Sequence, residues 1–298
     1  MAVTYHYEKA QLGDWRSPLD YLDTVITNDA NWVVKNRAYS PAPITGQNRL
    51  EELWIQSTNT TSGQTLSIQF KSTYGGDIEV AYSRDTDLAQ TWDNQPEAPK
   101  NSVSREGTKG NYQFITMWGR TMAPNYTVIA LSRDLIHVVW QGSHNDSEGA
   151  HRLIVYFGAL DKTHNYEDGV AFITSHKSGK SYFGIHYNTH WYQEGFGTAT
   201  SLEGLQGRLN DLSNSRMFEM NYNVHGLYAN PIALHCNTGL GGADTNLELV
   251  GFLPSGSFGT YYSNFPNILV QEEIHNKTYF AMPITNVPYI NTILYPLS

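Results

Sequence analysis

Residues 151–175 read HRLIVYFGALDKTHNYEDGVAFITS, and this stretch decides the fold class that the sequence predicts. Its two apolar runs, RLIVYF and VAFITS, have the length and the β-branched and aromatic content of strands. The polar residues between them, around Asp161–Asp168, predict a turn, with Gly158 and Gly169 easing the bends. The histidines and acids of the stretch show no spacing that would join them into a reactive group. We therefore interpret the stretch as two strands of a wall.

The segments around this stretch repeat the strand pattern. LSIQF places Leu66, Ile68 and Phe70 on one face and Ser67 and Gln69 on the other, which predicts a half-buried antiparallel strand. YTVIALS and LIHVVWQG flank a Ser-Arg-Asp triplet and predict a hairpin. Further strand-like segments are LEELWIQS, DIEVAYS, KSYFGIHY, LELVGFL, NILVQEE, TYFAMPITN and YINTILYPL.

One segment near the N-terminus, SPLDYLDTVITN, has the pattern of a helix. It begins at Ser17, and Asp20 completes an S-x-x-D capping pattern behind a proline suited to the first turn. Leu19, Leu22 and Ile26 recur at i, i+3 and i+7, which gives one apolar stripe. NWVV follows and leads into an irregular, proline-containing link, SPAPITG.

Two later segments bear on domain organisation. Leucines at near-helical spacing in 201–215 predict a second, weaker helix because two glycines interrupt it. Residues 91–112 are polar and rich in proline and glycine, which is typical of a long surface loop. We expect one β-rich domain over residues 1–298, with a seam near 92–112. The predicted fold is α+β and β-dominated, with antiparallel sandwich- or barrel-like sheets, an N-terminal helix and few short helices.

Composition excludes several classes of function. The chain has 19 basic and 28 acidic residues, a net charge of −9, and no basic cluster, which argues against nucleic-acid binding as its main task. One cysteine, Cys236, excludes an intrachain disulfide and a zinc site built from cysteines alone. The first residues do not resemble a signal peptide, and no apolar run is long enough to span a membrane. We therefore expect folding in a reducing cytoplasm and no membrane partner.

No candidate for chemistry has the spacing its chemistry needs. His186 and His190 would lie roughly 13 Å apart on a strand, too far for one zinc ion. The adjacent Glu51 and Glu52 would point to opposite faces, so they cannot form an acid–base pair. SRDTDLAQTW (83–92) differs from the Asp-box of sialidase-like propellers because Asp87 occupies the glycine position. We therefore predict no catalytic residue, no metal ligand, no cofactor and no enzymatic activity.

The order of these features resembles a family of virion structural proteins of tailed bacteriophages, found among the neck and tail genes of contractile-tailed phages. The early helix and step match SPLDYLDTVITNDANW, and the next strands match EELWIQSTNTTSGQTLSIQF. A hairpin matches VIALSRDLIHVVWQG, and the closing strand matches ITNVPYINTILYPL. The most distinctive match is HRLIVYFGALDKTHNYEDGVAFITS, where Asp168-Gly169 replaces the usual Gly-Gly.

The resemblance implies a non-enzymatic subunit of a ring in the neck, the head-to-tail connection or the tail. It implies a six- or twelve-fold homo-oligomer with neighbouring virion proteins as partners, assembled in the host bacterial cytoplasm and located in the virion. DNA would pass such a ring without sequence recognition. Tyr and Trp side chains are favoured at such contacts because they combine apolar area with a hydrogen-bonding tip. Our candidate packing or interface residues are His151, Tyr156, Phe157, Trp140, Trp191 and Tyr192.

Two other classes of function stay open. A baseplate or fibre-associated protein that binds host glycan would use aromatic clusters such as His190-Trp191-Tyr192 as sugar platforms. A glycan hydrolase would need two carboxyl groups at suitable separation in a cleft, and the sequence offers no such pair.

Overall fold

The computed structural model describes residues 3–9, 17–41, 48–57, 60–72, 77–84, 113–116, 126–141, 152–162, 169–176, 181–187, 190–194, 228–231, 233–237, 247–252, 258–261, 271–274, 277–283 and 292–296. The chain forms two compact units. One unit comprises Tyr5–Phe157, and the other comprises Met1–Thr4 with Gly158–Ser298. The predicted seam at 92–112 lies outside the described residues, whereas the division between the units falls within a strand, after Phe157.

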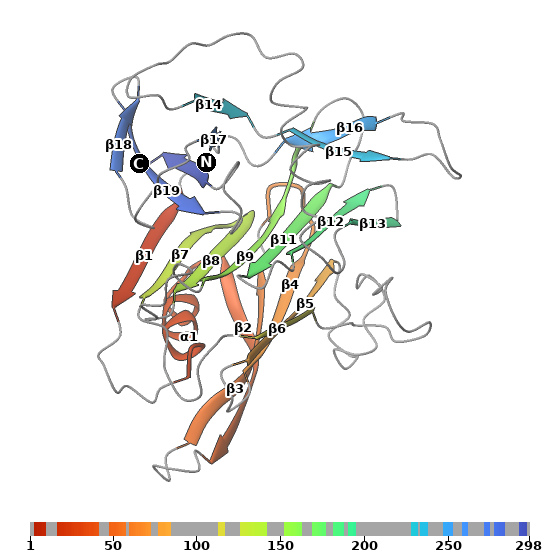
Figure 1. Ribbon diagram of the computed structural model, residues 1–298. Coiled ribbons are helices and arrows are strands. Elements are labelled where there is room, and N and C mark those ends of the chain that lie inside the picture. The colour runs from red at the N-terminus through yellow and green to blue at the C-terminus, as the bar shows by residue number, and fades with distance from the viewer. Residues whose placement is uncertain are drawn as a thin grey trace. The chain divides into compact units, whose positions relative to one another are not determined.

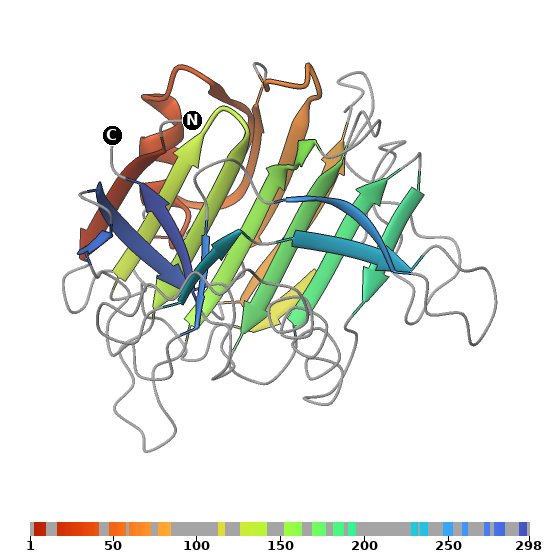
Figure 2. The same cartoon turned by 90° about the horizontal axis from the view of Figure 1, so that it is seen from above.

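The unit Tyr5–Phe157 contains two layers of strands and one described helix, α1 (Asp20–Thr27). One layer has the order β2-β3-β4-β5-β6, and the strands of the other follow the order β1-β7-β8-β9 (Figures 1 and 2). The strands are β1 (Thr4–Lys9), β2 (Trp32–Pro41), β3 (Asn48–Ser57), β4 (Leu66–Ser72), β5 (Asp77–Arg84), β6 (Gln113–Thr116), β7 (Tyr126–Ser132), β8 (Leu135–Gln141) and β9 (Arg152–Ala159).

Aromatic side chains fill the space between the two layers of this unit. The rings of Phe70 on β4 and Trp140 on β8 meet edge to face, with centroids 5.7 Å apart. The rings of Tyr82 on β5 and Phe157 on β9 also meet across the layers, tilted by 47° with centroids 5.1 Å apart. Facing antiparallel sheets joined by such interdigitating side chains form a β-sandwich. The predicted β-dominated α+β fold is therefore confirmed.

The strands β7, β8 and β9 are buried on both faces. In β8, Leu135, Ile136, Val138, Val139 and Trp140 are all fully buried, although neighbouring residues of a strand point to opposite faces. The residues of β7 from Val128 to Leu131 and of β9 from Leu153 to Phe157 are buried in the same way. Continuous apolar runs are typical of such doubly covered strands, so RLIVYF forms a central wall of the core.

The strand β4 differs from its predicted half-burial. Leu66, Ile68 and Phe70 are fully buried as expected, but Ser67 and Gln69 are also buried, at 0% and 4% exposure. Gln56 Nε2 of β3 donates a hydrogen bond to Ser67 Oγ over 3.2 Å. Hydrogen bonding between side chains lets this polar face be buried without water. The alternation correctly predicted the strand, but the prediction that one face is solvated was wrong.

The predicted capping interaction forms at Ser17. The regular helix α1 begins later than the sequence suggested, at Asp20. The Ser17 backbone N–H donates to the Asp20 carboxylate over 2.8 Å, and Ser17 Oγ accepts from the Leu19 N–H over 3.2 Å. Regular helix extends from Asp20 to Thr27 rather than over the whole predicted segment. The apolar stripe is confirmed, because Leu19, Leu22 and Ile26 are all buried.

The residues after NWVV continue a strand. Of the predicted irregular link SPAPITG (40–46), Ser40 and Pro41 belong to β2, and residues 42–46 lie outside the described residues. β2 continues through Pro41 and pairs with β3 along its length, from Trp32 opposite Ser57 to Pro41 opposite Asn48. Its register shifts between Val34 and Asn36 and again between Ala38 and Tyr39. Each shift interrupts the period-two pattern, which is why apolar alternation did not reveal the strand.

The unit that contains Gly158–Ser298 is also built from antiparallel strands. Its described strands follow the orders β11-β12-β13, β10-β16-β15 and β14-β17-β20-β19-β18. They are β10 (Asp161–Lys162), β11 (Val170–His176), β12 (Ser181–Tyr187), β13 (His190–Glu194), β14 (Tyr228–Pro231), β15 (Ala233–Asn237), β16 (Leu247–Phe252), β17 (Phe258–Tyr261), β18 (Gln271–Ile274), β19 (Lys277–Pro283) and β20 (Thr292–Pro296). The helix predicted at 201–215 lies outside the described residues.

Gly169 is needed for close packing rather than for an unusual backbone angle. A Cβ atom at this position would lie 2.9 Å from Leu160 Cδ1 and 3.3 Å from Leu160 Cβ. The Leu160 N–H donates to the Gly169 carbonyl over 2.8 Å, which holds the two residues together. Of the turn predicted around Asp161–Asp168, Asp161 and Lys162 form β10, and residues 163–168 lie outside the described residues.

Gly169→Ala is therefore expected to destabilise the protein by about 1–3 kcal/mol, the usual cost of overpacking. Urea unfolding would measure the loss. Leu160 is buried, so Leu160→Ala also costs stability, but the double variant should lose less than the sum of the two single losses because the smaller side chain makes room. A Gly169→Ala protein as stable as the wild type would show that the contact is not tight.

No helix among the described residues is both long and apolar enough to cross a membrane.

Candidate functional site

Three of the predicted packing or interface residues are buried within the unit Tyr5–Phe157. Trp140, Tyr156 and Phe157 are each fully buried. Trp191 and Tyr192 lie on β13, where they pair with His186 and Ile185 of β12. His151 lies outside the described residues. The structure thus brings Tyr156, Phe157 and Trp140 together on adjacent elements of one unit, where they pack within the chain.

Trp140 ties three elements together. Its ring packs on Phe70 of β4, and its Nε1 donates a hydrogen bond to the carbonyl of Pro18, just before α1, over 2.9 Å. Tyr156 lies against His137 of β8, with ring centroids 5.7 Å apart in an edge-to-face arrangement. Strand alternation places His137 and Tyr156 on the face of their sheet opposite to Trp140 and Phe157. His137 is fully buried there, so its imidazole is a packing group.

A buried carboxylate joins the two sheets at one end of the sandwich. Asp134 lies in the two-residue loop between β7 and β8, and it is only 2% exposed. Its Oδ1 accepts a hydrogen bond from the Thr61 N–H, and its Oδ2 accepts one from Thr61 Oγ1, each over 2.5 Å. Arg133 Nε lies 3.5 Å from Oδ2 and is the cationic neighbour. The carboxylate is thus used to hold the β3–β4 connection.

Neighbouring contacts reinforce this end of the sandwich. Ser57 Oγ donates to the Arg133 carbonyl over 2.5 Å, and Trp32 Nε1 donates to the Ser132 carbonyl over 2.6 Å. In the β3–β4 connection, the Gly63 N–H donates to the Thr60 carbonyl over 3.0 Å, and Gly63 has a φ of +78°. That left-handed conformation favours glycine in a tight turn. We name Asp134, Thr61, Ser57, Trp32 and the Ser132–Arg133 carbonyls the inter-sheet clamp.

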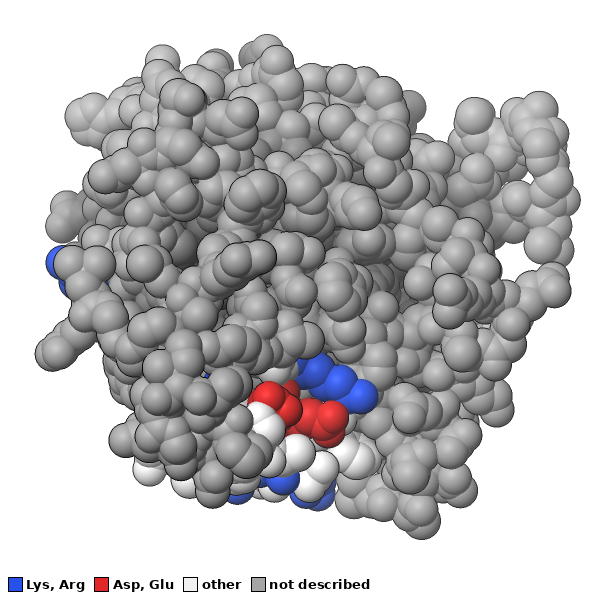
Figure 3. All heavy atoms as spheres, turned by 60° about the horizontal axis from the view of Figure 1, so that its bottom comes forward, with Lys and Arg blue, Asp and Glu red and all other residues white. Residues whose placement is uncertain are grey.

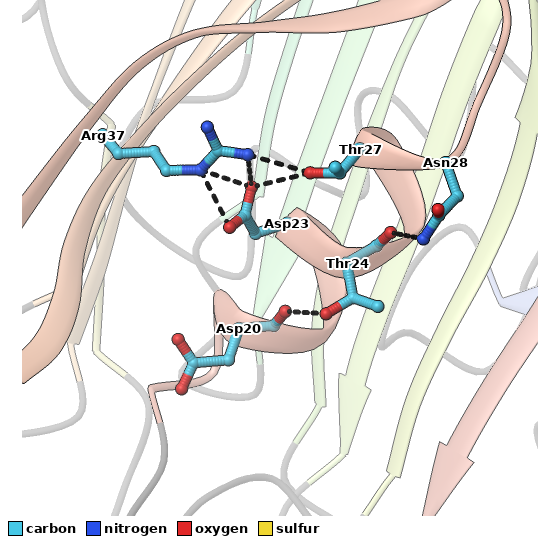
Figure 4. Close-up of polar contacts among 6 residues, drawn as sticks. All are labelled: Asp20, Asp23, Thr24, Thr27, Asn28 and Arg37. Carbon is cyan, nitrogen blue, oxygen red and sulfur yellow. Dashed lines mark hydrogen bonds and ion pairs between the residues drawn. The ribbon is translucent and has the colours of Figure 1, made fainter.

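A second polar cluster joins α1 to β2 (Figure 4). Arg37 Nε lies 2.9 Å from each carboxylate oxygen of Asp23, and its Nη2 donates to Thr27 Oγ1 over 2.8 Å. The hydrogen bond to Asp23 raises the pKa of Arg37, and burial opposes this effect. Along the helix, Thr24 Oγ1 donates to the Asp20 carbonyl, and Asn28 Nδ2 donates to the Thr24 carbonyl. This cluster orients α1 on β2. The Asp23 carboxylate and the Arg37 guanidinium are bound to each other.

Arg37→Ala is expected to destabilise the protein by no more than about 1 kcal/mol, because the pair with Asp23 is partly exposed to solvent. Raising the salt concentration should narrow the difference between the wild type and the variant, since salt screens exposed pairs. Urea unfolding at low and high salt measures both effects. A loss of several kcal/mol that salt does not change would contradict a surface role.

The strand β1 brings several tyrosines and a histidine close to α1. Burial raises the pKa of Tyr5, with further contributions from Tyr7 and Tyr21. Burial also raises the pKa of Tyr21, helped by Glu8 and opposed by a hydrogen bond from the Tyr7 backbone. These hydroxyls are kept neutral, so they serve as hydrogen-bonding groups rather than as bases.

Burial lowers the pKa of His6 below 6.5, and the Asp29 carboxylate partly opposes this shift. The unfolded chain therefore binds a proton at His6 more readily than the folded protein does. The contribution of neutral His6 to stability is complete above pH 6.5 and is lost as the pH falls through the folded-state pKa. We expect acidification from pH 7.5 to pH 5 to lower the urea midpoint more in the wild type than in His6→Gln. Parallel losses in the two proteins would contradict this.

Acidic and basic side chains are neighbours in one described part of the surface. Figure 3 shows described acidic side chains next to basic ones. Lys71 Nζ and Glu52 Oε1, on neighbouring strands, are 3.7 Å apart. Glu52 thus lies beside a cation. Among the described residues, no group of three or more His, Cys, Asp or Glu side chains could hold a metal ion.

The clamp was missed at the sequence level because its partners are far apart in the chain. Ser132-Arg133-Asp134 was visible only as a hairpin turn, and Thr61 lies 73 residues earlier. Comparison with known proteins gives no further assignment. No protein-family model matches the chain, and neither curated proteins nor solved structures include a significant match.

Proposed function

We propose that this chain is a non-enzymatic structural subunit of a tailed-bacteriophage virion, which forms a ring in the neck, the head-to-tail connection or the tail. The observation that supports it is the environment of β9, the segment that carries the most distinctive part of the resemblance. Residues Leu153 to Phe157 are buried on both faces of the strand. Residues in this position pack inside the protein and present no reactive group to solvent.

The use of polar groups in the unit Tyr5–Phe157 also favours a structural role. Asp134 accepts hydrogen bonds from Thr61, and Asp23 accepts one from Arg37. Gln56 donates a hydrogen bond to Ser67. A glycoside hydrolase needs two carboxyl groups that reach opposite sides of a bound sugar. Each of these described groups instead holds one element of the fold to another. Polar groups that connect strands suit a subunit that must bear load in an assembly.

The partners of the proposed subunit are further copies of the chain, in a six- or twelve-fold ring, and neighbouring virion proteins. A net charge of −9 supports passage of DNA without tight binding, since tight phosphate contacts need clustered basic residues. The proposed location is the virion, after assembly in the cytoplasm of the host bacterium. Acidic residues that line the central channel of the ring would let DNA slide past without binding. Acidic residues found only on the outer rim of the ring would remove this part of the proposal.

The oligomeric state of the purified protein tests this proposal. We expect sedimentation velocity and negative-stain images to show closed rings of six or twelve subunits. A monomer or trimer that binds defined glycans on an array would instead favour a baseplate or fibre-associated protein. Turnover of a polysaccharide, abolished by changing a single acidic residue, would establish an enzyme and overturn the proposal.

A further inference from the structure

Helix α1 contacts an edge strand of each sheet in the unit Tyr5–Phe157. β1 lies at the edge of its sheet beside β7, and β2 lies at the edge of the other sheet beside β3. An edge strand presents a row of backbone groups that can pair with a strand of another chain. Proteins protect such edges with bulges, charged side chains or a covering helix. All three devices occur here.

The contact of α1 with β2 is polar and well defined. Asp23 and Thr27, one helical turn apart, both bind the guanidinium of Arg37 at the middle of β2 (Figure 4). Two register shifts flank this residue, one between Val34 and Asn36 and one between Ala38 and Tyr39. Lys35, inside the first shift, is exposed. The helix is therefore attached at the bulged part of the edge.

The contact of α1 with β1 and the core comes from other side chains of the same segment. Tyr21 accepts a hydrogen bond from the backbone of Tyr7 on β1. Leu22, Val25 and Ile26 are buried, and Trp140 donates to the carbonyl of Pro18 at the start of the helix. One face of a two-turn helix thus reaches β1, and another reaches β2.

We propose that α1 is an edge guard, which keeps β2 from pairing with a strand of a second copy of this chain. The inference goes beyond the proposed function, because it applies to any copies held at high local concentration, whether or not they form a ring. Ordered assembly needs copies to meet only through intended surfaces. An unguarded edge would add open-ended sheet pairing to those contacts.

The test breaks the helix without touching the residues that bind either edge. Thr24 is exposed, and its side chain contacts only the helix itself among the described contacts. Thr24→Pro disrupts a helix interior, while Thr24→Ala at the same position preserves it. We expect the self-association constant of Thr24→Pro to be about tenfold higher than that of the wild-type protein. Thr24→Ala should leave it unchanged. Analytical ultracentrifugation over a range of concentrations measures both.

A second change separates edge pairing from aggregation of unfolded chains. Asn36 is exposed on β2, and a lysine there should disfavour strand addition. Thr24→Pro with Asn36→Lys should return to the wild-type state of association. In dissociated Thr24→Pro, the backbone amides of residues 32–41 should exchange hydrogen faster than in the wild type. Their exchange should slow once copies of the variant associate.

If Thr24→Pro does not fold, the double variant Tyr21→Phe with Asp23→Ala decides the question, since it removes polar contacts of α1 and leaves β2 unchanged. A rise in self-association that Asn36→Lys reverses supports the guard. An unchanged association constant overturns it, and so does a rise that Asn36→Lys leaves in place. A wild-type protein that fails to form rings would overturn the proposed function but would not alter this comparison between variants.

Discussion

Trp140→Ala is expected to destabilise the protein by about 3–5 kcal/mol, the largest loss that we predict for a single substitution. The indole is fully buried, and its ring packs edge to face on Phe70 between the two sheets. Its removal leaves a large cavity and also leaves the Pro18 carbonyl without its 2.9 Å hydrogen bond. Urea unfolding followed by circular dichroism measures the loss.

Two controls show whether the cost comes from the inter-sheet contact. Tyr39→Ala removes a tyrosine that is 55% exposed, and it should change stability by less than about 0.5 kcal/mol. A double-mutant cycle with Phe70→Ala should give a coupling energy of about 0.5–1.5 kcal/mol, as expected for an aromatic pair in contact. Additive losses with no coupling would contradict packing of these two sheets against each other.

Asp134→Ala is expected to destabilise the protein by about 3 kcal/mol, because charged hydrogen bonds inside a protein are strong and their loss leaves donors unsatisfied. Both donors belong to Thr61, through its N–H and its Oγ1. The variant should also loosen the β3–β4 connection, seen as faster hydrogen exchange around Thr60–Thr65. Asp134→Asn, which keeps an acceptor oxygen, should cost less than Asp134→Ala.

The clamp makes a further distinction possible. Thr61→Ala removes the hydroxyl donor but keeps the backbone N–H, so its cost should be smaller than that of Asp134→Ala. The two substitutions share one interaction, and their double mutant should be more stable than the sum of the single losses predicts. Equal costs for Asp134→Ala and for a surface acid such as Glu51→Ala would show that the carboxylate is not part of an inter-sheet connection.

The strands and the first helix could be predicted because their patterns depend on nearby residues. The apolar runs of β8 and β9 and the stripe on α1 are local signals. β2 escaped prediction because Lys35, Asn36 and Arg37 lie between two register shifts and show no alternation. The burial of Ser67 and Gln69 depends on what covers the sheet from elsewhere in the chain, which no local pattern contains.

The polar contacts between elements of this unit were harder to predict from the sequence. Arg37 and Asp23 are separated by 14 positions, and Asp134 and Thr61 by 73. Pairing at such distances is set by the arrangement of the two sheets rather than by spacing along the chain. The candidate packing residues Tyr156 and Phe157 were easier to identify, since they lie in a continuous apolar strand.

Direct imaging of the intact phage particle tests the central claim most sharply, because one measurement gives both location and symmetry. We expect a closed ring of six or twelve copies in the neck or tail, with density that fits the two-layered unit Tyr5–Phe157. A particle that lacks this chain, or that carries single copies or trimers at fibre tips, would contradict the account.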